Sequence, residues 1–381
     1  MQPANRLQET KEYYFSKKLK EVRALAAAGH PIINMGIGSP DLPAPQVAID
    51  AMIESMQDKV AHQYQSYTGI PTLREAMVSF YNKQYGVEVH PDNEILPLMG
   101  SKEGIMHISM AFLNPGDKVL FPNPGYPSYA AVTRLVEAEA VTYDLTEKNG
   151  WLPDLKALAK QDLTGVKLMW VNYPHMPTGT PVPEGFYEEL IAFAKAQSIL
   201  LINDNPYSFI LNDNPQSLLS IPGAKEVALE LNSLSKTFNM AGWRVGMVTG
   251  SAENIGHILR VKSNMDSGMF YGLQKGAIAA LGLDKKWFEY INGIYGKRRK
   301  LVFELVEKLK CTYDKNQVGL FVWAKLPEGI DAESFIDKVL LEKHIFITPG
   351  TIFGTMGEGY IRFSLCAKEE EIKTAMTRFD T

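Results

Sequence analysis

The chain reads Asn232-Ser-Leu-Ser-Lys236-Thr-Phe-Asn-Met-Ala-Gly-Trp-Arg244-Val-Gly246 directly after an apolar run at residues 227–231. The run predicts a buried strand, and Lys236 follows its end. A lysine that loses water there also loses proton affinity, so its amine becomes a usable nucleophile. Most isolated loop lysines are solvated, but Ser233, Ser235 and Arg244 beside it are donors that suit a phosphate. The stretch predicts a reactive lysine next to an anion site.

Length and composition indicate an ordinary globular protein with more than one domain. The chain has 381 residues, of which 45% are hydrophobic and 22% charged. A formal net charge of -4 gives no support for binding nucleic acid or an anionic membrane surface. Two cysteines, the absence of an apolar leader and the absence of a run of about 20 apolar residues predict a reduced, cytoplasmic protein without a membrane span.

Strand and helix patterns alternate between residues 94 and 250 and predict an α/β fold with a mostly parallel sheet. Helices are expected at residues 11–28, 45–57, 71–85, 101–113, 184–197, 332–341 and 368–379, and in most of 250–310. Strands are expected at 95–99, 119–121, 166–171, 200–204, 227–231, 321–324 and 359–365. The later elements predict a smaller α+β domain.

Chemically useful residues follow the ends of the predicted strands, namely Gly100, Tyr126, Asn172, Asp204 and Lys236. Ligands bind at that edge of open α/β sheets, so we expect these residues to lie together. Gly100-Ser101-Lys102 opens a helix, whose N–H groups favour an anion. Tyr126 in a proline-rich loop can present a flat face to a flat ring. Asp204 after an apolar strand needs a positively charged partner.

Two further positions indicate ligand binding. Arg362 lies within an apolar strand pattern and needs an acidic partner or a carboxylate ligand. Gly36 and Gly38 are half of a dinucleotide fingerprint, but its third glycine is missing and Pro40 stands where a helix would begin. A nicotinamide-dependent oxidoreductase is therefore disfavoured.

These motifs, in this order, resemble those of the class I/II aminotransferases, which are pyridoxal 5'-phosphate enzymes of fold type I. The resemblance runs from about residue 32 to residue 365 and is closest to the alanine and diaminopimelate aminotransferases. It implies a large cofactor-binding domain at residues 46–275, a small domain at 276–381, and an N-terminal arm with part of the small domain at 1–45. It also implies ping-pong transamination between an α-amino acid and a 2-oxo acid.

The resemblance assigns a role to each candidate. Lys236 would form the Schiff base and move the proton, Asp204 would pair with the pyridine nitrogen, and Tyr207 would bond the phenolic oxygen. Arg362 and Gly38 would orient the substrate. Phosphate would be held by Gly100, Ser101, Lys102, Ser233, Ser235 and Arg244; Tyr126 would stack on the ring, and Asn172 would contact cofactor and substrate.

Tyr64 begins the pattern Tyr-x4-Gly-x-Pro-x-Leu-Arg, in which the family's tyrosine reaches the phosphate in the neighbouring subunit. The resemblance thus implies a homodimer with shared active sites and no metal. One departure is Met176-Pro-Thr-Gly where the family has Asn-Pro-Thr-Gly. Methionine cannot donate to the phenolic oxygen, and His175 or Asn172 could take that place.

Two alternatives use the same cofactor. One is a β-elimination lyase on the same fold. The other is a cofactor-binding regulator, which would need a DNA-binding domain for which we expect no room before residue 30.

Overall fold

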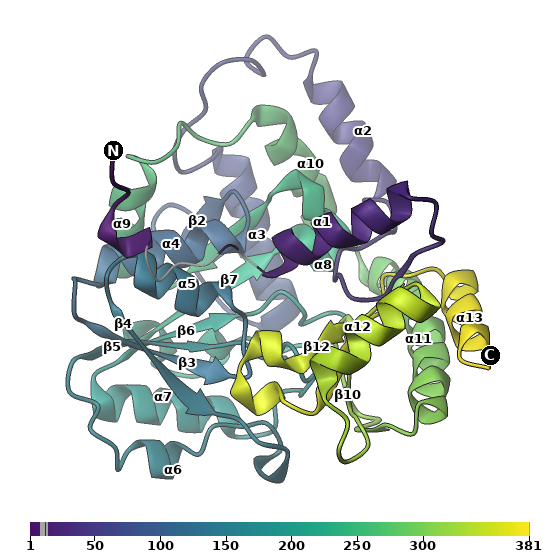
Figure 1. Ribbon diagram of the computed structural model, residues 1–381. Coiled ribbons are helices and arrows are strands. Elements are labelled where there is room, and N and C mark those ends of the chain that lie inside the picture. Colours follow the sequence, from purple (N-terminus) through teal and green to yellow (C-terminus); the bar gives the residue numbers. More distant parts are fainter. Residues whose placement is uncertain (8–11, 13, 381) are drawn as a thin grey trace.

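The computed structural model describes residues 1–7, 12 and 14–380. Its largest feature is a seven-stranded sheet with the order β2-β8-β7-β6-β5-β3-β4 (Figure 1). The strands are β2 (Ile95–Leu98), β3 (Lys118–Asn123), β4 (Glu139–Asp144), β5 (Val166–Val171), β6 (Leu200–Asp204), β7 (Ala228–Ser233) and β8 (Gly246–Thr249). Only β8 runs against its neighbours. The predicted mostly parallel α/β sheet is confirmed.

Both faces of this sheet are buried, which explains why its strands have continuous apolar sequences. In β5, Leu168 and Trp170 pack in the cluster beneath α4 (Ser101–Phe112), α5 (Ser128–Leu135) and α9 (Ala252–Lys262). Met169 and Val171 point into the opposite cluster. In Figure 1, α4 and α5 lie on one side of the strands, and α6 and α7 lie on the other.

That opposite cluster is covered by helices from distant parts of the sequence. They are α2 (Gln46–Ser55), α3 (Pro71–Tyr85), α6 (Leu155–Leu158), α7 (Phe186–Gln197) and α10 (Tyr271–Leu281). Helix α3 has the predicted limits, because Pro71 suits the first helical position and Gly86, with φ of 66°, terminates the helix in the left-handed conformation. Helix α2 is shorter than the predicted 45–57.

A third apolar cluster joins the C-terminal elements to the N-terminal ones. It includes α1 (Tyr14–Ala27), α11 (Lys285–Lys308), α12 (Ala332–Lys343), α13 (Glu369–Arg378), β10 (Phe321–Lys325) and β13 (Tyr360–Ser364). β10 and β13 form an antiparallel sheet with β9 (Thr312–Tyr313) and β12 (Thr348–Pro349). The predicted late helices and strands are confirmed. The expected start of the first helix at Lys11 lies outside the described residues.

Short elements complete the chain. β1 (Ile33–Asn34) pairs in parallel with β11 (Ile345–Phe346), which ties the early chain to its end. The helix α8 (Leu234–Thr237) carries Lys236. The 3-10 helices are η1 (Asn5–Leu7), η2 (Glu147–Asn149), η3 (Leu218–Ser220), η4 (Ala224–Glu226), η5 (Ala241–Trp243), η6 (Gly350–Phe353) and η7 (Thr355–Gly357). None of the helices among the described residues has the length and apolar character needed to cross a membrane.

Candidate active site

The carboxyl ends of the parallel strands meet at one edge, as expected. Gly100 follows β2, Tyr126 follows β3, Asn172 follows β5, Asp204 ends β6 and Lys236 follows β7. β2 points the same way as β7 because β8 is antiparallel to both. The topology therefore brings together residues that are up to 136 positions apart in the sequence.

A cavity of about 530 Å³ lies at this edge. Of the residues predicted for the site, all line the cavity except Gly100 and Tyr64. Its wall also contains apolar side chains that were not predicted for the site, which are Phe15, Leu19, Ile37, Pro206, Ala241, Phe321 and Phe353.

Lys236 is partly buried, and its Nζ donates a hydrogen bond to the carbonyl oxygen of Gly38. Burial lowers the pKa of the Lys236 amine to about 8, and the positive charges of Arg362 and Arg244 act in the same direction. At that pKa a fraction of the amine is unprotonated near neutral pH, and an unprotonated amine can act as a nucleophile.

Asp204 is buried at the end of β6, and its two oxygens differ. The hydroxyl of Tyr129 donates to Oδ2 at 3.0 Å, whereas Oδ1 has no hydrogen-bond partner among the described residues. Burial raises the pKa of Asp204 to about 7, partly offset by the Tyr129 hydrogen bond. An ionised Asp204 therefore needs a cation facing Oδ1. Tyr129 itself stacks on Trp170 at 5.0 Å between ring centres.

The start of α4 and Arg244 form the anion end of the cavity. Gly100 has φ of 87°, and a Cβ there would lie 2.0 Å from Nη2 of Arg244. The guanidinium is thus packed against the backbone that precedes Ser101, and its Nη1 donates to the carbonyl of Ala241 at 3.0 Å. Burial and the Arg244 charge lower the pKa of Lys102. Helix N–H groups and these cations suit a phosphate.

The serines of the lysine segment complete this end. Ser233 is the N-cap of α8, and its Oγ accepts from the backbone N–H of Ser235 at 3.2 Å. Both serines are buried and line the cavity. Lys236 is therefore fixed by a capped turn beside the anion end.

Arg362 also lines the cavity. Its Nη2 donates to the carbonyl of Gly36 at 2.9 Å, and its Nη1 lies 3.2 Å from the sulfur of Met176. Its guanidinium carbon is 3.8 Å from the ring centre of Phe321 and 4.6 Å from that of Phe353. Buried among aromatic rings, the guanidinium suits a carboxylate ligand.

Asn172 and His175 are the two candidates to replace the asparagine that the family has at the position of Met176, and their surroundings differ. Asn172 lines the cavity, donates to the carbonyl oxygen of Asp204 and accepts from the backbone N–H of Met176 at 3.0 Å. His175 is buried outside the cavity lining, and its Nδ1 is 2.8 Å from Oγ1 of Thr178. Burial lowers the pKa of His175 to about 3, which keeps the ring neutral. Asn172 is the better placed of the two.

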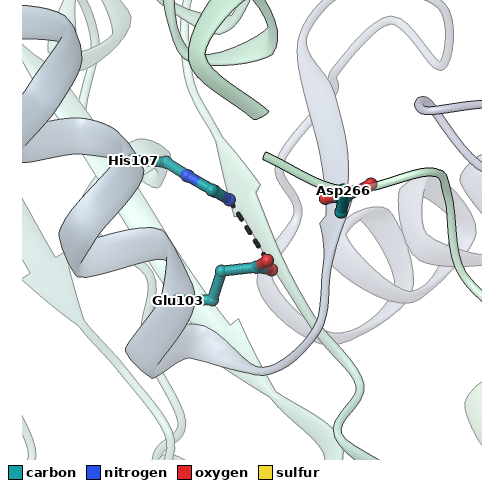
Figure 2. A group of neighbouring side chains, drawn as sticks. All are labelled: Glu103, His107 and Asp266. Carbon is teal, nitrogen blue, oxygen red and sulfur yellow. Dashed lines mark ion pairs between the residues drawn. The ribbon is translucent and has the colours of Figure 1, made fainter. Parts of the chain in front are cut away.

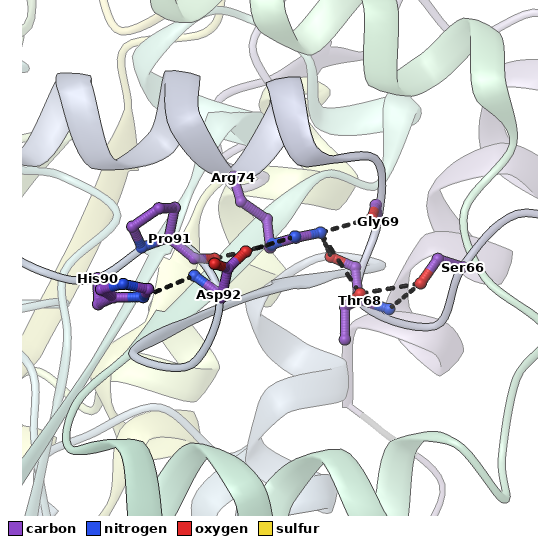
Figure 3. Close-up of polar contacts among 7 residues, drawn as sticks. All are labelled: Ser66, Thr68, Gly69, Arg74, His90, Pro91 and Asp92. Carbon is purple, nitrogen blue, oxygen red and sulfur yellow. Dashed lines mark hydrogen bonds and ion pairs between the residues drawn. The ribbon is translucent and has the colours of Figure 1, made fainter.

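Tyr64 lies outside the cavity of its own chain, with a relative exposure of 90%. The segment that follows it is anchored by Arg74, the last residue of the tyrosine pattern (Figure 3). Arg74 donates to the carbonyls of Gly69 and Pro91, each at 2.8 Å, and pairs with Asp92 at 3.0 Å. The arginine of the motif thus has a structural role, and the tyrosine points into solvent.

Directly after Ser101-Lys102, α4 carries Glu103, and His107 follows one turn later with its ring near that carboxylate (Figure 2). Nε2 of His107 is 3.2 Å from Oε1 of Glu103, and Asp266 lies within 4.8 Å of both. Lys262 pairs with Asp266 at 2.8 Å and donates to the carbonyl of Tyr67 at 2.9 Å. The lysine supplies the positive charge at Asp266, so the cluster joins α4, α9 and the Tyr67 segment.

The chain belongs to the class I and II aminotransferases, since the model of that family matches residues 30–379. Together with the sheet and the cavity, this makes it a fold-type I aminotransferase, an enzyme that transfers an amino group between an α-amino acid and a 2-oxo acid. The LL-diaminopimelate aminotransferase of Halothermothrix orenii is 41% identical over 380 residues, covering 99% of this chain and 98% of its own. The LL-diaminopimelate aminotransferase of Aquifex aeolicus is 37% identical over 377 residues, covering 98% of this chain and 97% of its own.

Solved structures give the same result. The substrate-bound structure of BacF from Bacillus subtilis has a TM-score of 0.95 at 35% identity, covering 99% of this chain and 97% of its own. A probable N-succinyldiaminopimelate aminotransferase from Thermus thermophilus has a TM-score of 0.89 at 32% identity, covering 96% and 98%. The predicted family, fold and reaction class are confirmed.

Proposed function

We propose that this aminotransferase holds pyridoxal 5'-phosphate in the cavity, with Lys236 as its Schiff-base lysine. The observation that carries the proposal is the pair formed by a buried amine of lowered pKa and a buried carboxylate with one unpartnered oxygen. A protonated ring nitrogen would satisfy Oδ1 of Asp204. The Arg244 guanidinium, which packs against the Gly100 backbone, and the N-terminus of α4 suit the phosphate.

Each polar residue of the lining then has a task. When bound, the cofactor supplies an electron sink for the negative charge that develops at the substrate Cα. Ser101, Lys102, Ser233, Ser235 and Arg244 would hold the phosphate, and Tyr126 would face the ring. Tyr207 and Asn172 would donate to the phenolic oxygen, in place of the donor that Met176 lacks.

The chain's own chemistry is proton transfer and orientation. Once freed by the incoming amino acid, the Lys236 amine would take the proton from the substrate Cα and deliver it again, alternately as base and acid. Arg362 would bind the α-carboxylate, with Gly38 bringing backbone close to it. The two halves of the reaction would follow a ping-pong order, because one cavity serves both the amino acid and the 2-oxo acid.

Product analysis tests this proposal. Purified enzyme loaded with pyridoxal 5'-phosphate should convert an amino donor and 2-oxoglutarate or pyruvate into a new 2-oxo acid and a new amino acid. Ammonia with pyruvate and no amino acid product would instead identify a β-elimination lyase. No conversion of any α-amino acid by the loaded enzyme would contradict the proposed function.

The organisation of the chain supports three further parts of the proposal. Residues 46–275 would form the cofactor domain, and residues 276–381 with 1–45 the small domain, since β1 pairs with β11. Cys311 and Cys366 are buried and free, which supports a reduced, cytoplasmic setting. The exposed Tyr64 supports a homodimer in which each subunit completes the phosphate site of the other.

Subunit exchange tests the shared site. Lys236→Ala and Tyr64→Ala proteins should each have low activity. In a mixed dimer one site would combine both lesions, while the other would have neither. Activity should therefore return to about half the wild-type value per dimer. No recovery after demonstrated exchange, or full activity of a monomer at high dilution, would contradict a shared site.

A further inference from the structure

Residues 35–41, between β1 and α2, form a segment that contacts both the reactive amine and the proposed carboxylate site. The backbone carbonyl of Gly38 accepts a hydrogen bond from Nζ of Lys236. Two residues earlier, the carbonyl of Gly36 accepts from Nη2 of Arg362 at 2.9 Å. The position of this backbone therefore affects how both side chains are oriented.

A buried ion pair holds the far end of the segment. Asp41 accepts two hydrogen bonds from Arg298 of α11, at 2.6 Å between Nη1 and Oδ1 and at 2.8 Å between Nη2 and Oδ2. The Arg298 side chain is 5% exposed, and that of Asp41 is 23% exposed. Two parallel hydrogen bonds from a planar guanidinium fix the direction of a carboxylate as well as its distance. Asp41 therefore has a defined position relative to α11.

Arg298 also contacts the chain just after the strand that carries Arg362. Its Nη1 donates to the carbonyl of Leu365 at 3.0 Å, and Leu365 directly follows β13. At the start of the segment, the N–H of Ser364 donates to the carbonyl of Met35 at 2.6 Å. The segment is thus joined to the end of β13 at both of its ends, once through the backbone and once through the Arg298 guanidinium.

The segment is packed closely against the sheets of the C-terminal part of the chain. A Cβ on Gly36 would lie 2.6 Å from Cε1 of Phe346 in β11, and a Cβ on Gly38 would lie 2.3 Å from Cζ of Phe321 in β10. Because close-packed interiors transmit strain, a displacement at Asp41 is passed along the segment.

Resting on the proposed function, we propose that the Arg298–Asp41 ion pair positions the site for the substrate α-carboxylate. By holding Asp41, Arg298 keeps the Gly36 carbonyl at Nη2 of Arg362, and this bond orients the Arg362 guanidinium for its ligand. Arg298 and Asp41 are positioning residues that act through Arg362.

The first test separates binding of the amino acid from the chemical step. Single turnovers of loaded enzyme without 2-oxo acid are followed against the concentration of the fastest donor in the product analysis. Arg298→Lys keeps the positive charge without the two parallel hydrogen bonds, and Asp41→Asn removes the negative charge. Each variant should raise the half-saturating concentration about tenfold and lower the limiting rate less than threefold.

An unchanged half-saturating concentration, or a loss confined to the limiting rate, would overturn the inference. If Arg298→Lys proves too unstable to assay, Asp41→Asn decides alone, because asparagine keeps the shape of a side chain that is 23% exposed.

Arg299→Lys is the matched control. Arg299 is the next residue of α11, and its Nη1 donates to the carbonyl of Gln317 at 2.6 Å. The same substitution on the same helix should leave the half-saturating concentration unchanged. An equal rise in this variant would show a general effect of altering α11 and would contradict a specific role for Arg298.

A double-mutant cycle tests whether the ion pair acts through Arg362. Asp41→Asn should raise the half-saturating concentration about tenfold in the wild-type background and less than threefold when Arg362→Lys is already present. Equal effects in both backgrounds would show that Asp41 does not act through Arg362.

Hydrogen exchange of the apoenzyme provides a readout that needs neither cofactor nor substrate. The N–H groups of Gly36 and Ile37 donate to Oδ1 of Asn34 at 3.1 and 3.2 Å. These amides should exchange about tenfold faster in Asp41→Asn than in the wild type, and at the wild-type rate in Arg299→Lys. Unaltered exchange in Asp41→Asn would show that the ion pair does not hold the segment.

The outcomes also separate this inference from the proposed function. If the wild-type enzyme transaminates and the variants bind the amino acid as the wild type does, only the inference fails. If no α-amino acid reacts with the loaded wild-type enzyme, the proposed function itself fails.

Discussion

Replacing Asp204 with asparagine removes one negative charge and keeps the shape of the side chain. In the native protein Oδ2 accepts from Tyr129 at 3.0 Å, and Oδ1 is left for a ligand. Burial raises the pKa of this carboxyl from 3.8 to about 7, which corresponds to about 4 kcal/mol against the ionised form. A protonated cofactor nitrogen would offset that cost by forming an ion pair with the carboxylate. Asparagine is neutral and cannot form this ion pair.

We therefore expect Asp204→Asn to lose about 3–4 kcal/mol of transition-state stabilisation, or about 100- to 1,000-fold in kcat/KM. Steady-state transamination at saturating cofactor measures the loss, and the absorbance of released cofactor reports how much the variant binds. Circular dichroism checks that the variant is folded.

Tyr129→Phe is the matched control. It removes the hydrogen bond to Oδ2 and leaves the charge, so the expected loss is about 1.5 kcal/mol, or roughly tenfold. If Asp204→Asn keeps kcat/KM within about threefold of wild type, or if Tyr129→Phe is the more damaging change, Asp204 does not pair with the cofactor.

Three further predictions concern the same cavity. Met176→Asn should lower the pKa of the lysine–cofactor linkage in a spectroscopic titration, because the new donor stabilises the deprotonated phenolic oxygen. An unchanged titration would show that Asn172 already donates to that oxygen. Tyr64→Phe should weaken cofactor retention by about 1 kcal/mol or more in equilibrium dialysis, and unaltered retention would argue against a phosphate contact. With a pKa of about 8, Lys236 is increasingly protonated as pH falls below 8, so covalent cofactor capture by apoenzyme should slow about tenfold per pH unit there and level off above 8. A rate independent of pH across that range would contradict the lowered pKa.

The sequence indicated most of the sheet because a parallel sheet buried on both faces has a strong local signal. β5 and β6 are continuous apolar runs, and the residues after them lie at one edge by topology alone. β8 was missed, since four residues from Gly246 to Thr249 carry little pattern and its antiparallel direction depends on its neighbours. The division into domains stays a prediction.

The substrate end could not be predicted in the same way. Phe15 and Phe353 are more than 300 residues apart and meet only around Arg362. Each is an ordinary core residue by local pattern, and no spacing links them. Tyr129 is a similar case, because its bond to Asp204 depends on how α5 packs against the sheet. Long-range packing decides these contacts, while local motifs mark the cofactor end and, for the substrate, only Gly38 and Arg362.

The identity of the cofactor-bearing lysine is the most direct test of the account. Borohydride reduction of the yellow, cofactor-loaded enzyme, followed by proteolysis and mass spectrometry, should place the reduced cofactor on the peptide that contains Lys236. Lys236→Ala should bind cofactor without forming that adduct and should lose turnover. A label on Lys102, or on any lysine other than Lys236, would contradict the proposed site.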